Sequence, residues 1–233
     1  MKHLAAQRGK GGPLKKKTQI AQGSLSRIQE KNRALILEAA LQEFSKVGYS
    51  GATVERIATA AGMSKSNLLY YFPSKAAMYE SVLGRILDDW LAPLRTLDPL
   101  GDPAQELRAY IGSKLTISAR HPQASRLFAN EIMRGAPRLG RVLETDLKAL
   151  VADKCDVIES WIKAGKIRPV NPVHLIFTIW ATTQHYADFA PQVRAITGTD
   201  LSDPDFFAET EKTVTDLILA GLGLQMPQAA KVA

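Results

Sequence analysis

The sequence of 233 residues contains little of what marks several classes of protein. Its single cysteine, Cys155, excludes a disulfide framework within the chain and fits a reducing compartment. No apolar run reaches the roughly 18 residues that span a bilayer. The basic N-terminus lacks the apolar stretch of a secretory signal. We therefore expect a cytoplasmic protein that does not enter a membrane, with enough apolar residues (45%) for a full core.

Signatures of catalysis are also missing. The histidines His3, His121, His174 and His185 do not have the spacing of metal ligands. The sequence has neither a Gly-rich phosphate loop nor a nucleophile elbow. Cys155 lies in an apolar, helical context, where a thiol is inert. These absences predict that the protein is not an enzyme and has no metal site and no cofactor.

Acidic residues are absent from residues 1–27, although this segment carries seven of the 30 basic residues. The remaining 23 basic residues face 23 acidic ones, so the whole net charge of +7 lies in this segment. We predict a disordered basic arm at 1–27 and a disordered tail at 226–233. The arm is either a solubilising tail or remnant of expression, or an element that lies along nucleic-acid phosphates.

Helical periodicity dominates the rest of the chain, and the alternation typical of strands is nowhere sustained. The predicted fold class is therefore all-α. Residues 28–75 are expected to form a three-helix helix-turn-helix head, and residues 76–225 a ligand-binding and dimerisation bundle. Pro93 is expected to close the helix that links them. The predicted helices span residues 32–47, 53–61, 65–71, 75–91, 104–119, 122–133, 139–164, 171–189 and 204–222.

Two short predicted helices meet at residues 62–64 and form a helix-turn-helix. Thr53 caps the first helix, and Ser64 caps the second. The second helix of such a motif lies in the major groove and presents its N-terminal turn to base edges. That turn offers Lys65, Ser66 and Asn67, which are short polar groups and one cation.

The same helix ends with two tyrosines. Successive residues on a helix point about 100° apart, so Tyr70 and Tyr71 cannot share one role. One is expected to pack while the other directs its hydroxyl to a phosphate, and the sequence does not decide between them. For either alone, ordinary core packing is the alternative. Lys75 adds a cation at the start of the next helix, a suitable phosphate site.

The stretch ALQEFSKVGYSGATVERIATAAGMSKSNLLYYFPSKAAM, residues 40–78, resembles the DNA-binding head of the TetR family of bacterial repressors. The resemblance covers about residues 32–80. It implies a homodimer on a near-palindromic double-stranded operator, with Thr53 at a phosphate and residues 65–67 at bases. The expected DNA contacts are Thr53, Ser64, Lys65, Ser66, Asn67, Tyr70, Tyr71 and Lys75.

Three segments of the body also resemble members of this family that regulate pyrimidine use. They are PQASRLFANEI at 122–132, DLKALVADKCDVIESWIKAGKI at 146–167 and HLIFTIWATTQHYADFAPQV at 174–193. The resemblance implies a repressor that uracil or thymine releases from its operator. It also implies that the helices near 171–189 and 204–222 form the dimer interface.

The segment 174–190 suits a small planar ligand. On a helix, Trp180, Thr183 and Gln184 share one side with Phe177 close by, so an indole and an amide meet there. We expect this side to face the ligand and the side of Ala181 to face the dimer partner, although the reverse is possible. The expected ligand contacts are Arg126, Phe177, Trp180, Thr183, Gln184 and Tyr186, with Trp90 as a weaker candidate. The opposite side consists of Thr178, Ala181, His185 and Phe189.

Some alternatives remain open at this level. Trp180 also suits plain core packing, and Arg126 also suits an ion pair with Glu131 or Asp188. The effector could instead be a hydrophobic drug that an efflux operon responds to, although an aromatic content of only 7% favours a small polar ligand. A third reading is a basic architectural protein that binds DNA without sequence preference.

Overall fold

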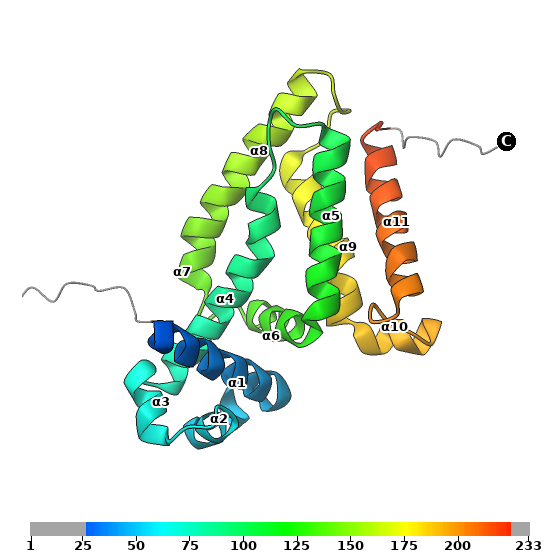
Figure 1. Cartoon of the computed structure of the whole chain (residues 1–233). Coiled ribbons are helices and arrows are strands. Elements are labelled where there is room, and N and C mark those ends of the chain that lie inside the picture. The colour runs from blue at the N-terminus through cyan, green and yellow to red at the C-terminus, as the bar shows by residue number, and fades with distance from the viewer. Residues whose placement is uncertain (1–26, 225–233) are drawn as a thin grey trace, which may run out of the picture.

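The computed structural model describes residues 27–224, and all regular structure within them is helical (Figure 1). This confirms the predicted all-α fold. The proposed arm, apart from Arg27, and the proposed tail lie outside the described residues. Within residues 27–224 no helix combines the length and apolar character needed to cross a membrane.

The head consists of α1 (Arg27–Gly51), α2 (Val54–Ala60) and α3 (Lys65–Tyr71). Helix α1 starts five residues earlier than predicted and is interrupted at Gly48, whose φ of 71° is in the left-handed region. The three helices share one core. The head contributes to this core the buried side chains of Ile36, Ala40, Phe44, Ile57, Leu68 and Phe72.

The body begins with α4 (Lys75–Arg95), α5 (Pro103–Arg120) and α6 (Pro122–Met133). The chain then continues through α7 (Gly140–Val142), the π-helical segment η1 (Leu143–Leu147) and α8 (Lys148–Lys163). It ends with α9 (Pro172–Asp188), α10 (Ala190–Thr197) and α11 (Pro204–Gly221). In Figure 1, α4, α5, α8, α9 and α11 stand higher in the view than the head, with α6 near the lower ends of α4 and α5 and α10 near the lower end of α11.

Two predictions about the body need correction. Pro93 does not close α4, which continues to Arg95, because the proline removes only the hydrogen bond that its own N–H would donate to the carbonyl four residues earlier. Leu94 and Leu97 after it are buried. The expected helix 139–164 is confirmed as a continuous helical run from Gly140 to Lys163, which contains the π-helical segment η1. Helix α10 is an additional helix, because Pro191 does not interrupt the chain as a helix breaker. It lies in the first turn of α10, where proline is favoured.

Two hydrophobic cores meet along α4. The first joins the head to α6 and to residues Met78–Trp90 of α4. The second, which begins at Leu94, joins the end of α4 to α5, α8, α9 and α11. Helices α4 and α6 therefore connect the head to the body. A displacement of either helix changes the packing of the head and of the body.

Candidate DNA interface and ligand cavity

The turn between α2 and α3 is held by side-chain caps. The Thr53 hydroxyl accepts a hydrogen bond from the backbone N–H of Arg56 at 3.2 Å. The Ser64 hydroxyl accepts one from the backbone N–H of Asn67, also at 3.2 Å. Gly62 adopts a φ of 67°, which suits the sharp turn. Both predicted caps are present, and these bonds fix the direction in which α3 leaves the head.

The N-terminal turn of α3 presents Lys65, Ser66 and Asn67 to solvent. The Lys65 ammonium lies 2.5 Å from Oε1 of Glu55 on α2, and this hydrogen bond lowers the pKa of the Glu55 carboxyl. The pair is exposed, so solvent screens it and its contribution to stability is small. The ammonium therefore stays accessible at the outer surface of α3.

The structure separates the roles of the two tyrosines. The Tyr71 hydroxyl accepts a hydrogen bond from Asn32 Nδ2 at 2.8 Å, and its carbonyl accepts one from Arg33 at 3.0 Å. Tyr71 thus fastens α3 to α1. Tyr70 is 72% exposed, and its hydroxyl has no hydrogen-bond partner within residues 27–224. Tyr70 is therefore the tyrosine whose hydroxyl is available to a phosphate.

Lys75 differs from the expectation. Its ammonium donates to the carbonyls of Tyr49 and Ala52, each at 2.9 Å, and lies 4.6 Å from the centre of the Tyr49 ring. These carbonyls belong to the end of the first helix and the segment after it, where acceptors lack helical partners. Lys75 therefore faces into the head and holds α4 to α1, rather than projecting toward a phosphate.

A cavity of about 660 Å³ opens within the body. Its walls come from α4, α5, α6, η1 and α9, and most of them are apolar. The indoles of Trp90 and Trp180 form two flat portions of the wall. Its volume is within the roughly 300–1,000 Å³ typical of small-molecule sites.

Three of the six expected ligand residues line this cavity, namely Arg126, Trp180 and Gln184. The other three lie elsewhere. Phe177 is 49% exposed beside Trp180, and the buried Thr183 hydroxyl donates to the carbonyl of Ile179 at 2.7 Å. Tyr186 packs edge-on against the ring of Phe206.

The error has a geometric cause. The cavity side of α9 is rotated from the side that we predicted, so Ala181 and His185 line the cavity, as does Phe189 just beyond the helix. We had assigned these residues to the dimer partner. Sequence periodicity shows which residues share a side of a helix, but not which neighbour that side faces.

The Trp180 indole is held in place by a hydrogen bond to α5. Its Nε1–H donates to the Tyr110 hydroxyl at 2.6 Å. Burial raises the pKa of this hydroxyl, so it remains protonated. The indole therefore offers the cavity its ring face rather than its N–H, which suits stacking against a planar molecule.

A lysine that we did not predict lies in the cavity wall. Lys114 of α5 is only 2% exposed, and its ammonium lies 3.7 Å from the centre of the Trp90 ring. It makes no hydrogen bond to any group of residues 27–224. Burial lowers its pKa to about 7, and the charge of Asp188 partly opposes this shift. An unpaired cation in such a site is costly unless something binds there.

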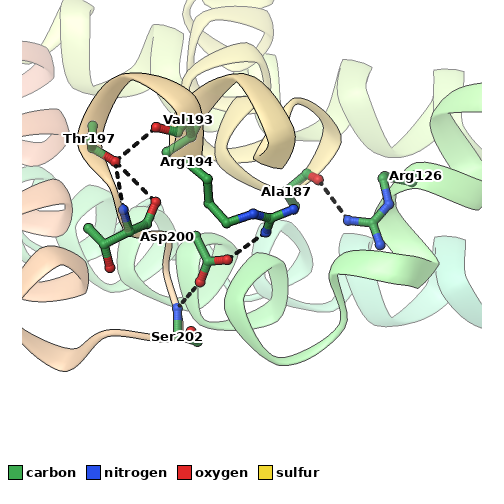
Figure 2. Close-up of polar contacts among 8 residues, drawn as sticks. Arg126, Ala187, Val193, Arg194, Thr197, Asp200 and Ser202 are labelled. Carbon is green, nitrogen blue, oxygen red and sulfur yellow. Dashed lines mark hydrogen bonds and ion pairs between the residues drawn. The ribbon is translucent and has the colours of Figure 1, made fainter.

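Asp188, the last residue of α9, also lines the cavity. Its Oδ1 accepts a short hydrogen bond from the buried Ser125 hydroxyl. Burial raises the pKa of Asp188, whereas the Ser125 hydrogen bond and the charges of Arg126, Lys114 and His185 lower it. The Arg126 guanidinium donates to the neighbouring carbonyl of Ala187 at 3.3 Å (Figure 2).

The segment after Asp188 is held by its own polar contacts. Arg194 of α10 lies 2.7 Å from Asp200, whose other oxygen accepts from the Ser202 N–H at 2.9 Å (Figure 2). Hydrogen bonds from Ser202 and Arg194 lower the pKa of Asp200 to about 2. These contacts hold the turn after α10 against that helix.

Both the head and the body match known protein families. Residues 36–82 match the family of bacterial regulatory proteins, tetR family, and residues 83–225 match the C-terminal region of YcdC-like proteins, a TetR C-terminal family. The chain belongs to the TetR family of transcriptional regulators. TetR regulators bind operator DNA and small-molecule ligands and act as dimers.

Individual relatives of the chain are also transcriptional regulators. The chain is 50% identical over 200 residues to the HTH-type transcriptional regulator RutR of Escherichia coli K12. The aligned residues make up 86% of this chain and 94% of RutR. It is 27% identical over 199 residues to the HTH-type transcriptional repressor NicS of Pseudomonas putida, which covers 83% and 93% of the two chains. These TetR proteins are regulators, in agreement with the prediction that the chain is not an enzyme.

Solved structures show the same TetR fold. The transcriptional regulator SCO4942 of Streptomyces coelicolor superposes with a TM-score of 0.67 at 27% identity, covering 83% of this chain and 99% of that one. The ketosteroid regulator KstR2 of Mycobacterium tuberculosis gives a TM-score of 0.64 at 23% identity, covering 82% and 94%.

One signal for the missed lysine was present in the sequence of this TetR protein. Leu107, Ile111, Leu115 and Ser118 recur at helical spacing and form the buried stripe of α5. Lys114 lies within that stripe, next to Leu115. A lone charge on an apolar stripe is almost never fully buried without a partner. Its position therefore marked Lys114 as a candidate for a functional cation.

Proposed function

We propose that this TetR regulator is a pyrimidine-responsive repressor, and that uracil or thymine in the cavity releases its homodimer from a palindromic operator. The carrying observation is the composition of the cavity, which combines two indole walls with Gln184 and several charged groups. The resemblance of the body segments to pyrimidine regulators supports the same conclusion.

A pyrimidine ring suits these walls. Its faces stack on Trp90 or Trp180, whose hydrophobic areas contribute most of the affinity. Its edge carries carbonyl oxygens and N–H groups, which need polar partners once the ring leaves water. Gln184 supplies both a donor and an acceptor.

Helix α4 provides a route from the cavity to DNA. Leu87, Trp90 and Leu91 of α4 line the cavity, while Met78 and Val82 of the same helix pack against the head. A ligand that shifts α4 therefore changes the separation of the two heads of a dimer. Half-sites lie about 34–36 Å apart per turn of DNA, so a small change prevents both heads from docking.

A regulator of an efflux operon or another operon is the second candidate. The size of the cavity and its mostly apolar wall also suit a larger, more hydrophobic effector than uracil. Such an effector would use the indoles and leave the charged groups without partners.

Calorimetry with purified protein separates the two candidates. We expect uracil and thymine to bind and purines and hydrophobic drugs to bind far more weakly. Operator affinity, followed by fluorescence anisotropy, should fall about 5- to 150-fold at saturating uracil, the usual range of allosteric coupling. An operator affinity that saturating uracil leaves unchanged would reject the pyrimidine proposal.

A further inference from the structure

The starting point is the unsatisfied ammonium of Lys114. It is 2% exposed, lines the cavity and has no hydrogen bond within residues 27–224. The Trp90 ring covers one side of it at 3.7 Å, but a ring face accepts no conventional hydrogen bond. Its N–H groups therefore need an acceptor that enters the cavity, such as a ring carbonyl.

Asp188 provides the opposite chemistry. Ser125 donates to its Oδ1, which leaves acceptor capacity on the other oxygen. Asp188 lines the same cavity as Lys114, yet no ion pair within 4.0 Å joins them among the described residues. Lys114 and Asp188 thus place opposite charges in one cavity without forming an ion pair. A ligand with both a carbonyl and an N–H can bind both of them.

Arg126 supplies a second donor near Asp188. Its guanidinium is fixed against the carbonyl of Ala187, the residue before Asp188, and lines the cavity (Figure 2). Only one of its five N–H groups makes that bond. Besides His185 of α9 itself, the charged groups that act on Asp188 are thus a donor from α5 and a donor from α6, which share the carboxylate of α9 as a neighbour.

We propose that Lys114, Asp188 and Arg126 form a donor–acceptor–donor set that recognises a cyclic imide edge, in which one N–H lies between two carbonyls. This rests on the proposed function only in naming uracil and thymine as the imides. In both, the edge formed by the two carbonyls and the N3–H has the complementary order. Asp188 is then the residue that determines specificity, because it accepts the central N–H.

The same set rejects cytosine. Cytosine has a bare nitrogen at ring position 3 and an amino group at position 4. These would set an acceptor against the Asp188 carboxylate and a donor against a cation. A buried polar group left without its partner costs more than a missing apolar contact, so this arrangement discriminates strongly.

The experiment compares two isomers of equal size by calorimetry on the full-length protein. 1-Methyluracil keeps the imide edge, whereas 3-methyluracil replaces its central N–H by a methyl group. We expect 1-methyluracil to bind within about threefold of uracil, and 3-methyluracil and cytosine to bind at least about tenfold more weakly. Glutarimide, a saturated ring with the same edge, should also bind.

Asp188→Asn tests the central residue. We expect at least a tenfold loss of uracil affinity and a smaller preference for uracil over cytosine. The control is Asp156→Asn, which removes an exposed carboxylate of α8 outside the cavity. Unchanged operator affinity and melting temperature would show that the Asp188→Asn protein is folded.

The outcomes separate this inference from the proposed function. If uracil binds but 3-methyluracil binds equally well, the imide set is rejected while the pyrimidine effector stands. If no pyrimidine binds but glutarimide does, the imide set stands and the pyrimidine effector is rejected. A wild-type protein that binds none of these compounds rejects both.

Discussion

The outer surface of the head and the cavity of the body use charge in opposite ways. On the head, Lys65 and Glu55 pair in water, with about half of each side chain exposed. In the cavity, Lys114 is buried without a hydrogen bond to any residue of 27–224, and among these residues only Ser125 donates a hydrogen bond to the Asp188 side chain. An exposed pair changes stability little, whereas a buried unpaired cation costs several kcal/mol by an order-of-magnitude estimate. Such a cost indicates selection for binding rather than for folding.

The largest effect is expected from Lys114→Met, which removes the buried charge and keeps the length of the side chain. The apoprotein should become about 1–4 kcal/mol more stable, because a well-packed apolar residue replaces a desolvated cation. Uracil should no longer release the operator. Thermal melting and operator anisotropy measure the two effects.

Lys212→Met is the control, because Lys212 is an exposed residue paired with Asp216 on α11. It should change neither property. A Lys114→Met protein that is less stable yet still responds to uracil would contradict the view that this lysine is kept for binding.

Asn67→Ala tests the head in the same way. An amide that contacts a base edge contributes about 1–3 kcal/mol of discrimination, so we expect a 5- to 150-fold loss of operator affinity. Uracil binding should stay unchanged, because Asn67 is exposed on α3 and no residue of α3 lines the cavity. Competition between operator and random DNA measures the specificity that is lost.

The pH dependence of effector binding follows from Lys114. Its pKa is about 7 in the folded protein, so it loses its proton as the pH rises from 6 to 8.5. Uracil affinity should fall about tenfold over that range, and binding at pH 7.5 should take up protons. Calorimetry in buffers with different ionisation enthalpies measures this uptake.

Stability should change in the opposite direction. The pKa of Lys114 is lower in the folded chain than its ordinary value of 10.5, so the unfolded chain binds more protons between pH 7 and 10.5. The contribution of Lys114 to stability therefore improves as the pH rises through this window. The other charged groups of the cavity are Arg126, His185 and Asp188. If His185→Gln abolishes the pH dependence of uracil affinity and Lys114→Met preserves it, that dependence is due to the histidine instead.

The paired tyrosines give a smaller effect. Tyr70→Phe should weaken operator binding about fivefold without changing the melting temperature, because its hydroxyl is exposed. Tyr71→Phe should lower stability by about 1 kcal/mol, because it removes the hydrogen bond from Asn32. Each variant is the control for the other, and identical effects would contradict their separate roles.

The smallest effect is expected from Glu55→Gln. It removes the carboxylate that holds Lys65, so Lys65 becomes free to contact phosphates. Nonspecific DNA binding should strengthen about twofold, with a steeper dependence on salt. Titrations at several salt concentrations measure this slope, and a decrease in affinity would show that Glu55 positions Lys65 for the operator.

Much of the head was predictable because its signals are local. Thr53 and Ser64 cap helices that follow them directly, and Gly62 turns the chain between them. Such features depend on neighbours within a few residues. The positions of Tyr71 and Lys75 were not predictable, because their partners Asn32, Tyr49 and Ala52 lie 23 to 39 residues away in the sequence.

The cavity shows more clearly what sequence periodicity does not predict. Periodicity placed Trp180 and Gln184 on one side of a helix, but it could not exclude Thr183 or include His185, since only packing decides which side meets α4 and α6. Arg126 was recognised as a useful cation, whereas Lys114 was missed.

The sequence alone therefore determined the helical class, the helix-turn-helix and the TetR family, because each depends on short-range patterns of caps, turns and periodicity. The tertiary structure decided which tyrosine is free, which lysine is buried and which side of α9 faces the cavity. Each of these depends on contacts between helices that are distant in the sequence, and the free energy of burying or exposing a group is set by those contacts.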